Sequence, residues 1–193
     1  MSLGFYFNQE RCVGCKACQV ACKDRLDLQK AGARPRRVTH FEVGKFPSVD
    51  FVHTSIGCNH CERPACVANC PTGAMFKDEE TGIVLHNDEA CIGCKTCVNS
   101  CPYEAPQYDD VQSLIVKCDS CKALRDSGAN PVCVDACAMR ALDFGDISEL
   151  SEKYGEGLVR EAVGLPSASD TDPNVLVAPR RVGDDGDVRE IAL

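Results

Sequence analysis

The chain lacks tryptophan and is poor in the other aromatic residues. Its 193 residues include 7 Phe and 4 Tyr and no Trp, which excludes a core built mainly from large aromatic rings. The length corresponds to one or two domains. Because hydrophobic residues (44%) and charged residues (26%) are present in ordinary amounts, global disorder is also excluded. Something other than aromatic packing must therefore stabilise the fold.

A basic excess and a long apolar run are also missing, and we expect no leader segment in the first residues. Lys and Arg number 21 against 29 Asp and Glu, a net charge of −8, so we expect no nucleic-acid partner. No apolar run approaches the ~18 residues of a spanning helix. Met1–Glu10 has neither a basic nor an apolar region, so we expect no secretory signal there. The Arg36–Arg37 and Arg180–Arg181 pairs lack the apolar segment that follows a twin-arginine export signal.

Cysteine is the residue that the sequence has in excess. The sixteen cysteines fall into four groups of four, with none left over. Group one is Cys12-x2-Cys15-x2-Cys18-x3-Cys22, group two is Cys58-x2-Cys61-x4-Cys66-x3-Cys70-Pro71, group three is Cys91-x2-Cys94-x2-Cys97-x3-Cys101-Pro102, and group four is Cys118-x2-Cys121-x11-Cys133-x3-Cys137. Group three has the full C-x2-C-x2-C-x3-C-P pattern of bacterial two-cluster ferredoxins.

The spacing within each group has a physical reason. Gaps of two residues let consecutive thiolates converge on one cubane. A cysteine four positions on, at the end of a helical turn, points the other way and ligates the cluster of a partner group. Proline after the last cysteine, as at Pro71 and Pro102, ends the helical turn. The spacing therefore predicts that the groups share clusters.

Zinc sites and disulfides are the alternatives to iron–sulfur clusters. A zinc site predicts two close pairs of cysteines separated by a longer insert, and only group four approaches this. Disulfides require an oxidising compartment. We favour four [4Fe–4S] clusters, which would take the net charge from −8 to roughly −16. Basic residues near the groups either offset this charge or are ordinary solvated surface: Lys16, Lys23, Arg63, Lys95, Lys117, Lys122 and Arg140.

The sequence between the cysteines predicts an α+β fold. We expect strands at Leu3–Asn8, Phe51–Ile56, Leu114–Lys117 and Ala141–Phe144, a hairpin of Ala74–Lys77 with Gly82–Leu85, and helices over Ala17–Leu26, after Pro64, and over Lys95–Ser100 and Pro131–Ala136. A further helix begins at a cap by Asp146 or Ser148, runs through Tyr154 and ends at Gly155. Arg34–Phe51 is interpreted as a mixed connecting segment.

The four groups repeat a ferredoxin unit, and the cysteines stop before the last quarter of the chain. We interpret residues 146–193 as a C-terminal extension, made of a helix and a partner-binding tail. Within that tail the apolar island Asn174–Ala178 is either a loose terminus or an arm that lies on a partner.

No catalytic residue can be assigned from the sequence. Every cysteine is taken by a group, and no Gly-rich phosphate loop is present. His60 is an exposed loop residue or modulates a cluster by hydrogen bonding, since the groups are already complete without it. The remaining histidines, His40, His53 and His86, are interpreted as structural or solvated. The chain is therefore not expected to be an enzyme on its own.

The segments around the groups resemble a known family. RCVGCKACQVACKD, CNHCERPACVANCPTGAM, CIGCKTCVNSCPYEAPQY, KCDSCKALRDSGANPVCVDACAMRALDFG and PNVLVAPR are similar to the iron–sulfur electron-transfer subunit of the dimethyl sulfoxide reductase family of molybdopterin oxidoreductases. The resemblance runs from Gly4 to about Ala178. It departs at Ala138, where proline often follows the last cysteine, and over Gly32–Asp50.

The resemblance implies which cysteines hold which cluster. Cluster one would use Cys12, Cys15, Cys18 and Cys137; cluster two Cys118, Cys121, Cys133 and Cys22; cluster three Cys91, Cys94, Cys97 and Cys70; and cluster four Cys58, Cys61, Cys66 and Cys101. Groups one and four pair in this arrangement, as do groups two and three. The resemblance therefore implies two pseudo-symmetric ferredoxin-like modules: residues 1–50 with 106–145 hold groups one and four, and residues 51–105 hold groups two and three.

The resemblance also implies partners and a place in the cell. Cluster one would face a large catalytic subunit with a molybdenum or tungsten bis-pterin (bis-MGD) cofactor, and cluster four a membrane anchor that handles quinol in anaerobic respiration. The protein would be a peripheral subunit of a membrane complex, exported with its catalytic partner to the extracytoplasmic face; a cytoplasmic location is the alternative. The rival functions are a free-standing soluble polyferredoxin and a zinc-built interaction module.

Overall fold

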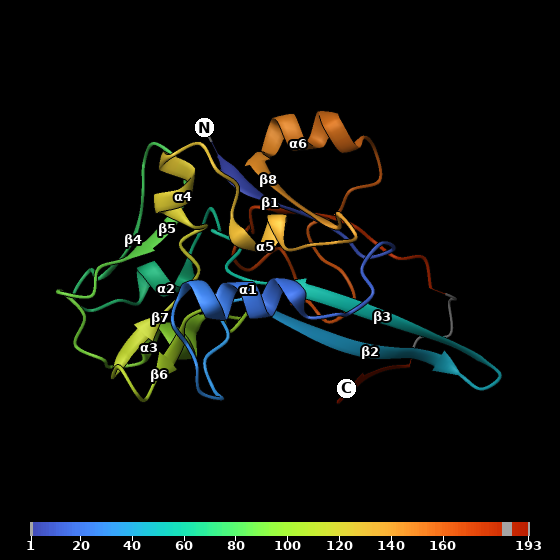
Figure 1. Ribbon diagram of the computed structural model, residues 1–193, viewed down its shortest axis with the longest axis horizontal. Helices are drawn as coiled ribbons and strands as arrows, with labels where there is room; N and C mark the ends of the chain where they lie inside the picture. The colour runs from blue at the N-terminus through green and yellow to red at the C-terminus, as the bar shows by residue number, and fades with distance from the viewer. Residues whose placement is uncertain (1, 183–186, 193) are drawn as a thin grey trace.

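The computed structural model describes residues 2–182 and 187–192, so residues 183–186 and 193 of the expected tail, like Met1, lie outside the described part. Short helices lie between pairs of mostly antiparallel strands, as expected for an α+β fold (Figure 1). The helices are α1 (Ala17–Arg25), α2 (Ala65–Ala68), α3 (Thr96–Ser100), α4 (Lys122–Asp126), α5 (Val132–Asp135) and α6 (Ile147–Tyr154). The strands are β1 (Leu3–Asn8), β2 (Arg37–Lys45), β3 (Ser48–Ile56), β4 (Met75–Lys77), β5 (Val84–His86), β6 (Gln107–Asp109), β7 (Leu114–Val116), β8 (Leu142–Asp146), β9 (Val175–Ala178) and β10 (Val188–Ile191).

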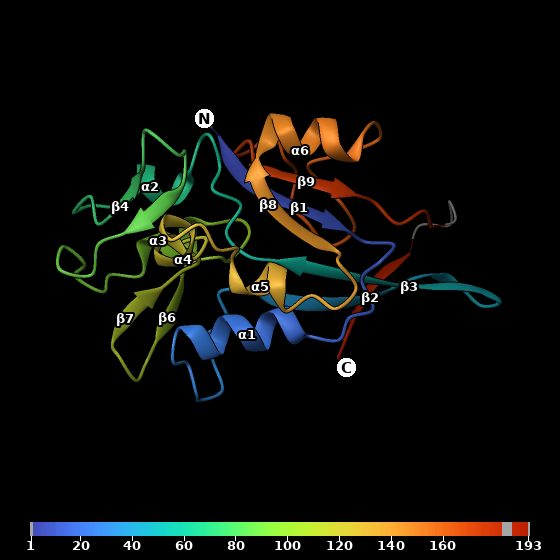
Figure 2. The same cartoon turned by 45° about the horizontal axis from the view of Figure 1, so that its top comes forward.

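One three-stranded sheet, in the order β8-β1-β9, joins the N-terminal strand to two strands from the last third of the sequence. The central strand β1 is antiparallel to β8 and parallel to β9. Helix α6 lies over this sheet (Figure 2), and the rings of Tyr6 and Tyr154 stack with centroids 3.5 Å apart. The cap predicted for α6 is confirmed, because the Asp146 side chain accepts a hydrogen bond from the amide of Ser148 at 2.9 Å and Gly155 follows the last turn.

The second sheet corrects the prediction for Arg34–Phe51. Strands β2 and β3 form a long antiparallel hairpin, paired from Arg37 with Ile56 to Lys45 with Ser48, and β10 adds to its edge. Pro35 and Pro47 favoured a connecting segment in the sequence. In the structure both prolines lie outside the ladder, since Pro35 precedes β2 and Pro47 occupies the turn. The hairpin extends away from the rest of the molecule in Figure 1.

The apolar island Asn174–Ala178 is part of the core of this protein. Its residues 175–178 form β9, which pairs with β1 in register from Phe5 with Val175 to Asn8 with Ala178. Val177 is completely buried. Neither expectation, a loose terminus or an arm on a partner, holds for these residues. The sequence carries no local signal for this strand pair, because parallel strands are not joined by a short turn and β1 and β9 lie far apart in the chain.

The expected division into modules remains a prediction, and one boundary needs adjustment. Strand β3 (Ser48–Ile56) runs across the expected boundary after Asp50 and pairs along its whole length with β2. The predicted hairpin after group two is confirmed as β4 paired with β5. Within residues 2–182 and 187–192, no helix is long and apolar enough to cross a membrane.

Candidate metal centres

Three of the four cysteine sets expected from the resemblance each line one cavity. Quartet one is Cys12, Cys15, Cys18 and Cys137; quartet three is Cys70, Cys91, Cys94 and Cys97; quartet four is Cys58, Cys61, Cys66 and Cys101. The space free of atoms in the three cavities is alike, about 340, 290 and 330 Å³ respectively. The similar volumes suggest that the three sites take the same kind of group.

The fourth set, quartet two, consists of Cys22, Cys118, Cys121 and Cys133, and all four are buried. The pKa of Cys22 is raised to about 12, first by burial and then by like-charge repulsion from the sulfurs of Cys118, Cys133 and Cys121, which outweighs the opposing charge of Arg36. The four thiols therefore lie close together. No disulfide joins any of the sixteen cysteines, all of which lie among the described residues.

Short helices divide the cysteines between neighbouring quartets. Helix α1 contains Cys18 of quartet one and Cys22 of quartet two, which are four residues apart and so separated by ~6 Å along the helix axis. Helix α5, which packs against α1, contains Cys133 and is followed by Cys137. Helices α2 and α3 divide quartets three and four in the same way. The gap of three residues thus directs the fourth cysteine of each group away from the first three cysteines of that group and into the neighbouring quartet.

The backbone forms the same anion-binding turn in all four groups. In each, the residue two positions after the first cysteine has a left-handed conformation and directs its amide N–H at that cysteine's sulfur. These pairs are Gly14 (φ 68°) with Cys12, His60 (φ 45°) with Cys58, Gly93 (φ 67°) with Cys91 at 3.5 Å, and Ser120 (φ 52°) with Cys118 at 3.3 Å. Successive amides in such turns make concavities that favour negative charge and occur at iron–sulfur sites.

Packing fixes the turn of group one. A Cβ atom on Gly14 would lie 2.7 Å from Cε1 of His40, and the hairpin β2–β3 supplies both His40 and His53 beside it. The imidazole rings of these two histidines are joined by an Nδ1···Nδ1 contact of 3.0 Å. The hairpin β2–β3 therefore covers quartet one, with His40 on the strand that was expected to be a connecting segment and His53 on the strand predicted at Phe51–Ile56.

Burial raises the pKa of thiols in all four quartets, which favours their protonated form. Burial raises the pKa of Cys61 and Cys66 to about 12, and that of Cys133 to about 11. In quartet three, by contrast, the pKa of Cys94 is lowered, first by the Thr96 hydroxyl at 3.3 Å and then by the Thr96 amide. Metal binding at the buried quartets must displace protons from the sulfurs.

The donor set fits a polynuclear iron–sulfur cluster better than a single metal ion. Thiolates on one tetrahedral zinc lie about 3.8 Å apart, given a Zn–S distance of about 2.3 Å. In the described part of the chain, no three His, Cys, Asp or Glu side chains are arranged to hold one ion; the thiols surround a cavity instead. Asn59 Nδ2, which is buried and belongs to a residue lining the quartet-four cavity, has no hydrogen-bond partner among the described residues.

The spatial order of the quartets differs from their numbering. Quartets one and two share α1 and α5, and quartets three and four share α2 and α3. Lys117 joins the two pairs, with Nζ 3.9 Å from Cys58 Sγ and 2.6 Å from the carbonyl oxygen of Cys118. The order is therefore one, two, four, three. Set four, which the resemblance implies would face a membrane anchor, thus lies beside quartet two, and set three lies at the end of this order.

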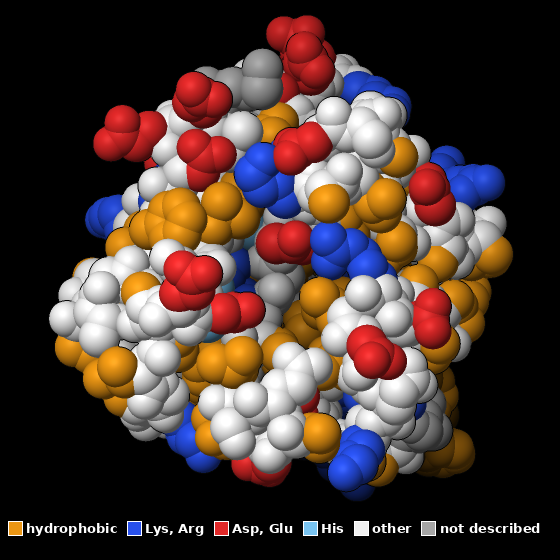
Figure 3. All heavy atoms as spheres, turned by 60° about the vertical axis from the view of Figure 1, so that its left-hand side comes forward, with side chains coloured by type: hydrophobic (Ala, Val, Ile, Leu, Met, Phe, Trp, Pro, Cys, Tyr) orange, Lys and Arg blue, Asp and Glu red, His pale blue; other side chains and the backbone are white. Residues whose placement is uncertain are grey.

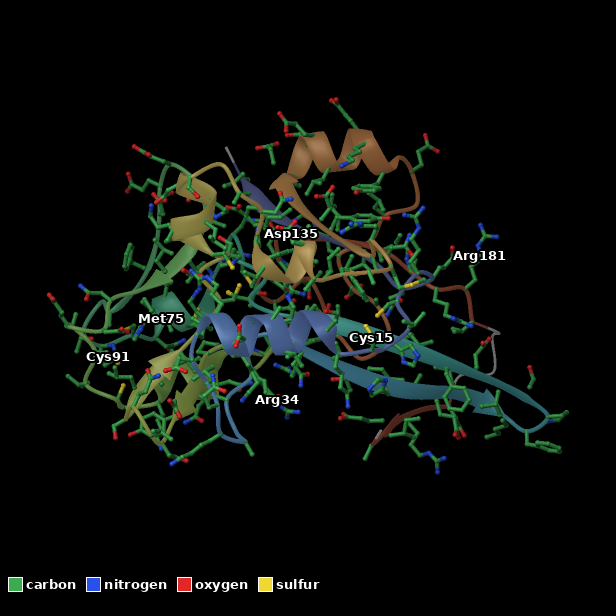
Figure 4. All side chains as sticks on the ribbon, in the orientation of Figure 1. Cys15, Arg34, Met75, Cys91, Asp135 and Arg181 are labelled. Atoms are coloured by element: carbon green, nitrogen blue, oxygen red, sulfur yellow. The ribbon has the colours of Figure 1, made fainter. Side chains whose placement is uncertain are left out.

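Exposure agrees with this order. Cys15 of quartet one and Cys94 of quartet three are exposed, whereas quartet two is buried throughout. Figure 4 shows Cys15 and Cys91 well apart along the long axis. The face shown in Figure 3 carries hydrophobic side chains among charged ones, and Ile92, which lines the quartet-three cavity, is 68% exposed. Quartets one and three are therefore the ones that can approach another molecule.

Several polar residues have roles that the sequence did not reveal. Of the two interpretations of His60, the exposed loop residue is wrong, because the side chain is fully buried; its Nδ1 accepts a hydrogen bond from the amide of Val84 at 3.1 Å. Burial and the nearby Lys117 charge lower its pKa well below the ordinary value, which keeps it neutral. His86 lines the quartet-three cavity and pairs with Asp88 at 2.8 Å. Arg36 was considered only as part of an export signal, yet it is 2% exposed; no sequence signal marks it.

Together, these features define an iron–sulfur protein of the ferredoxin type. The description "4Fe-4S dicluster domain" matches residues 49–147 and, in a second version, residues 11–75. Similar proteins are the B chain of the anaerobic dimethyl sulfoxide reductase of Haemophilus influenzae, 44% identical over 92% of this chain and 89% of its own length, and that of Escherichia coli, 41% identical over 91% and 88%. Protein NrfC of Escherichia coli is 31% identical over 94% of this chain and 82% of its own length. The protein belongs to the family of anaerobic dimethyl sulfoxide reductase B chains, which are iron–sulfur proteins of electron transport.

Proposed function

We propose that the four quartets hold four [4Fe–4S] clusters, one cluster to each quartet. The observation that carries this proposal is that three quartets, each assembled from two cysteine groups, line cavities of similar volume. The repeated amide-to-sulfur turn supports it, because it supplies hydrogen bonds to the first thiolate of every group. The two-module division of the chain, with paired groups one and four and paired groups two and three, follows from the same assignment.

We further propose that the protein relays electrons within a respiratory reductase. An iron–sulfur cluster supplies reversible one-electron storage at a potential set by its surroundings. The protein's own residues do the rest: the shared helices set neighbouring quartets one helical turn apart, and burial excludes water from quartet two. Because the exposed cysteines Cys15 and Cys94 belong to quartets one and three, these two quartets are the points of exchange with partners.

The partners are proposed from the relatives. Quartet one faces a large catalytic subunit with a molybdopterin (bis-MGD) cofactor, and quartet three faces a membrane anchor that handles quinol. Quartet three takes the place beside the anchor that the resemblance gave to cluster four, because quartet four lies between quartets two and three. The protein is then a peripheral subunit of a membrane complex on the extracytoplasmic face, and it has no catalytic residue of its own.

Co-purification tests the proposed function. The protein is expressed with the catalytic and anchor subunits of its own organism, and the membrane fraction is purified without oxygen. We expect the three proteins in one complex, and quinol should reduce the clusters. A protein that purifies alone, and whose clusters quinol leaves oxidised in the mixed membranes, would instead be a free-standing polyferredoxin. Zinc in place of iron would show that the protein is a zinc-built interaction module and not an electron-transfer subunit.

A further inference from the structure

Arg36 is a buried cation without a carboxylate partner among the described residues. It directly precedes β2 and is 2% exposed. Its guanidinium lies over the ring of Phe5, 4.5 Å from the centroid, and Nη1 donates a hydrogen bond to Ser55 Oγ at 3.2 Å. Nε has no hydrogen-bond partner in the described part of the chain. An arginine so deeply buried is normally balanced by an acidic group, because an unpaired charge in the interior is costly.

The groups that surround Arg36 are cysteines of two quartets. Ser55 Oγ, which accepts from Arg36, also lies 3.3 Å from Cys18 Sγ of quartet one. The charges that most favour the guanidinium are those of Cys133, Cys18, Cys118 and Cys22, three of which belong to quartet two. Neutral thiols cannot balance a guanidinium, which keeps its charge at every accessible pH. The arrangement is balanced only when quartets one and two are negatively charged.

We propose that Arg36 is a fixed positive charge, shared by quartets one and two, that stabilises the reduced state of the clusters in both. This inference rests on the proposed ligand sets. Reduction adds one electron, and hence one unit of negative charge, to a cluster. A nearby buried cation lowers the free energy of the reduced form more than that of the oxidised form, so it raises the midpoint potential. Arg36 therefore acts on this pair of sites and leaves quartet three, at the far end of the row, unaffected.

The test compares Arg36→Gln with the matched variant Arg34→Gln in the complete complex. Both changes remove one positive charge, but Arg34 is far less buried than Arg36. The midpoint potentials are read from the spin-resonance signals during a redox titration, and iron and sulfide are counted in the same samples. In Arg36→Gln we expect two of the four one-electron steps to move to lower potential. A tenfold weaker reduction equilibrium, the least that we expect, lowers each midpoint potential by about 59 mV. Arg34→Gln should shift none.

A second variant, Arg36→Lys, separates charge from shape. If Arg36→Gln loses its clusters while Arg36→Lys keeps them, the potentials of Arg36→Lys decide. Potentials that match the unsubstituted protein support the proposal, and lower potentials at quartets one and two contradict it. If both variants lose clusters, Arg36 has a packing role and the proposal is wrong. It is also wrong if Arg36→Gln keeps full iron and unchanged potentials, or if all four steps shift equally. The iron count separates these outcomes from failure of the ligand assignment, which would show in the unsubstituted protein.

Discussion

Val177→Ala tests whether β9 belongs to the core of this protein. Val177 is completely buried, pairs with Phe7 across the sheet, and exchanges two backbone hydrogen bonds with Val159, of 2.8 and 2.9 Å. The substitution removes two carbons from the core. At ~0.8 kcal/mol each, burial of these groups contributes about 1.6 kcal/mol, and the cavity left behind raises the cost to about 2 kcal/mol or more. If the whole loss of stability acts on the unfolding step, the unfolding rate rises by about 30-fold.

The assay is the rate of unfolding of the cluster-loaded protein in guanidinium without oxygen, because loss of metal makes an equilibrium measurement unsuitable. Visible absorption reports the clusters and far-UV circular dichroism reports the strands. The matched control is Val188→Ala on β10, where the side chain is 50% exposed, and we expect almost no change. Equal unfolding rates for Val177→Ala and the unsubstituted protein would refute the assignment of β9 to the core.

Three further predictions concern the sites and the surface. Cys94→Ser should leave a three-iron cluster at quartet three alone, since the other three thiolates remain; spin resonance and a loss of one iron per chain would show it. Gly14→Ala should deplete iron from quartet one, because the new Cβ meets a histidine ring, whereas Gly157→Ala, with a similar backbone conformation and open space, should not. Asp143→Asn should speed unfolding at pH 7 but not at acidic pH. Burial raises the pKa of Asp143, but its hydrogen bonds, first with Lys153 at 2.7 Å, lower it more, so the pKa is lower in the folded protein than in the unfolded chain. The charged carboxylate therefore stabilises the fold above about pH 3.9, and this stabilisation is lost as the pH falls through the pKa of the folded protein.

Each of these predictions has an outcome that contradicts it. Four intact cubanes in Cys94→Ser would remove Cys94 from the ligand set. A Gly14→Ala protein with the iron content of Gly157→Ala would show that the histidine pair can move aside. A constant difference in unfolding rate from neutral to acidic pH would mean that Asp143 contributes through packing and not through its charge.

Much of the site could be predicted from the sequence, because cysteine spacing is a local property. The gap of three residues places Cys18 and Cys22 one helical turn apart whatever the rest of the chain does. The strand Leu3–Asn8 and the capped helix that ends at Gly155 are likewise set by neighbouring residues. These elements appear in the structure close to where the sequence indicates them.

Long-range features escaped the sequence for an equally physical reason. Strand β9 exists because β1 offers an edge to it, and β2 because β3 does, so neither has a strong local signature. The burial of Arg36 and His60 depends on sulfur atoms and rings contributed by distant segments. The order of the quartets is visible only from contacts between distant segments, such as those of Lys117 with Cys58 and Val84, which connect the two pairs of groups.

Iron and acid-labile sulfide, measured per chain in protein purified without oxygen, test the central claim most directly. Sixteen cysteines in four quartets predict about sixteen iron and about sixteen sulfide, with no zinc. Mössbauer spectra of the same sample should show only cubane iron. A content near twelve iron in fully loaded protein, or a metal content without sulfide, would contradict the assignment of one [4Fe–4S] cluster to each quartet.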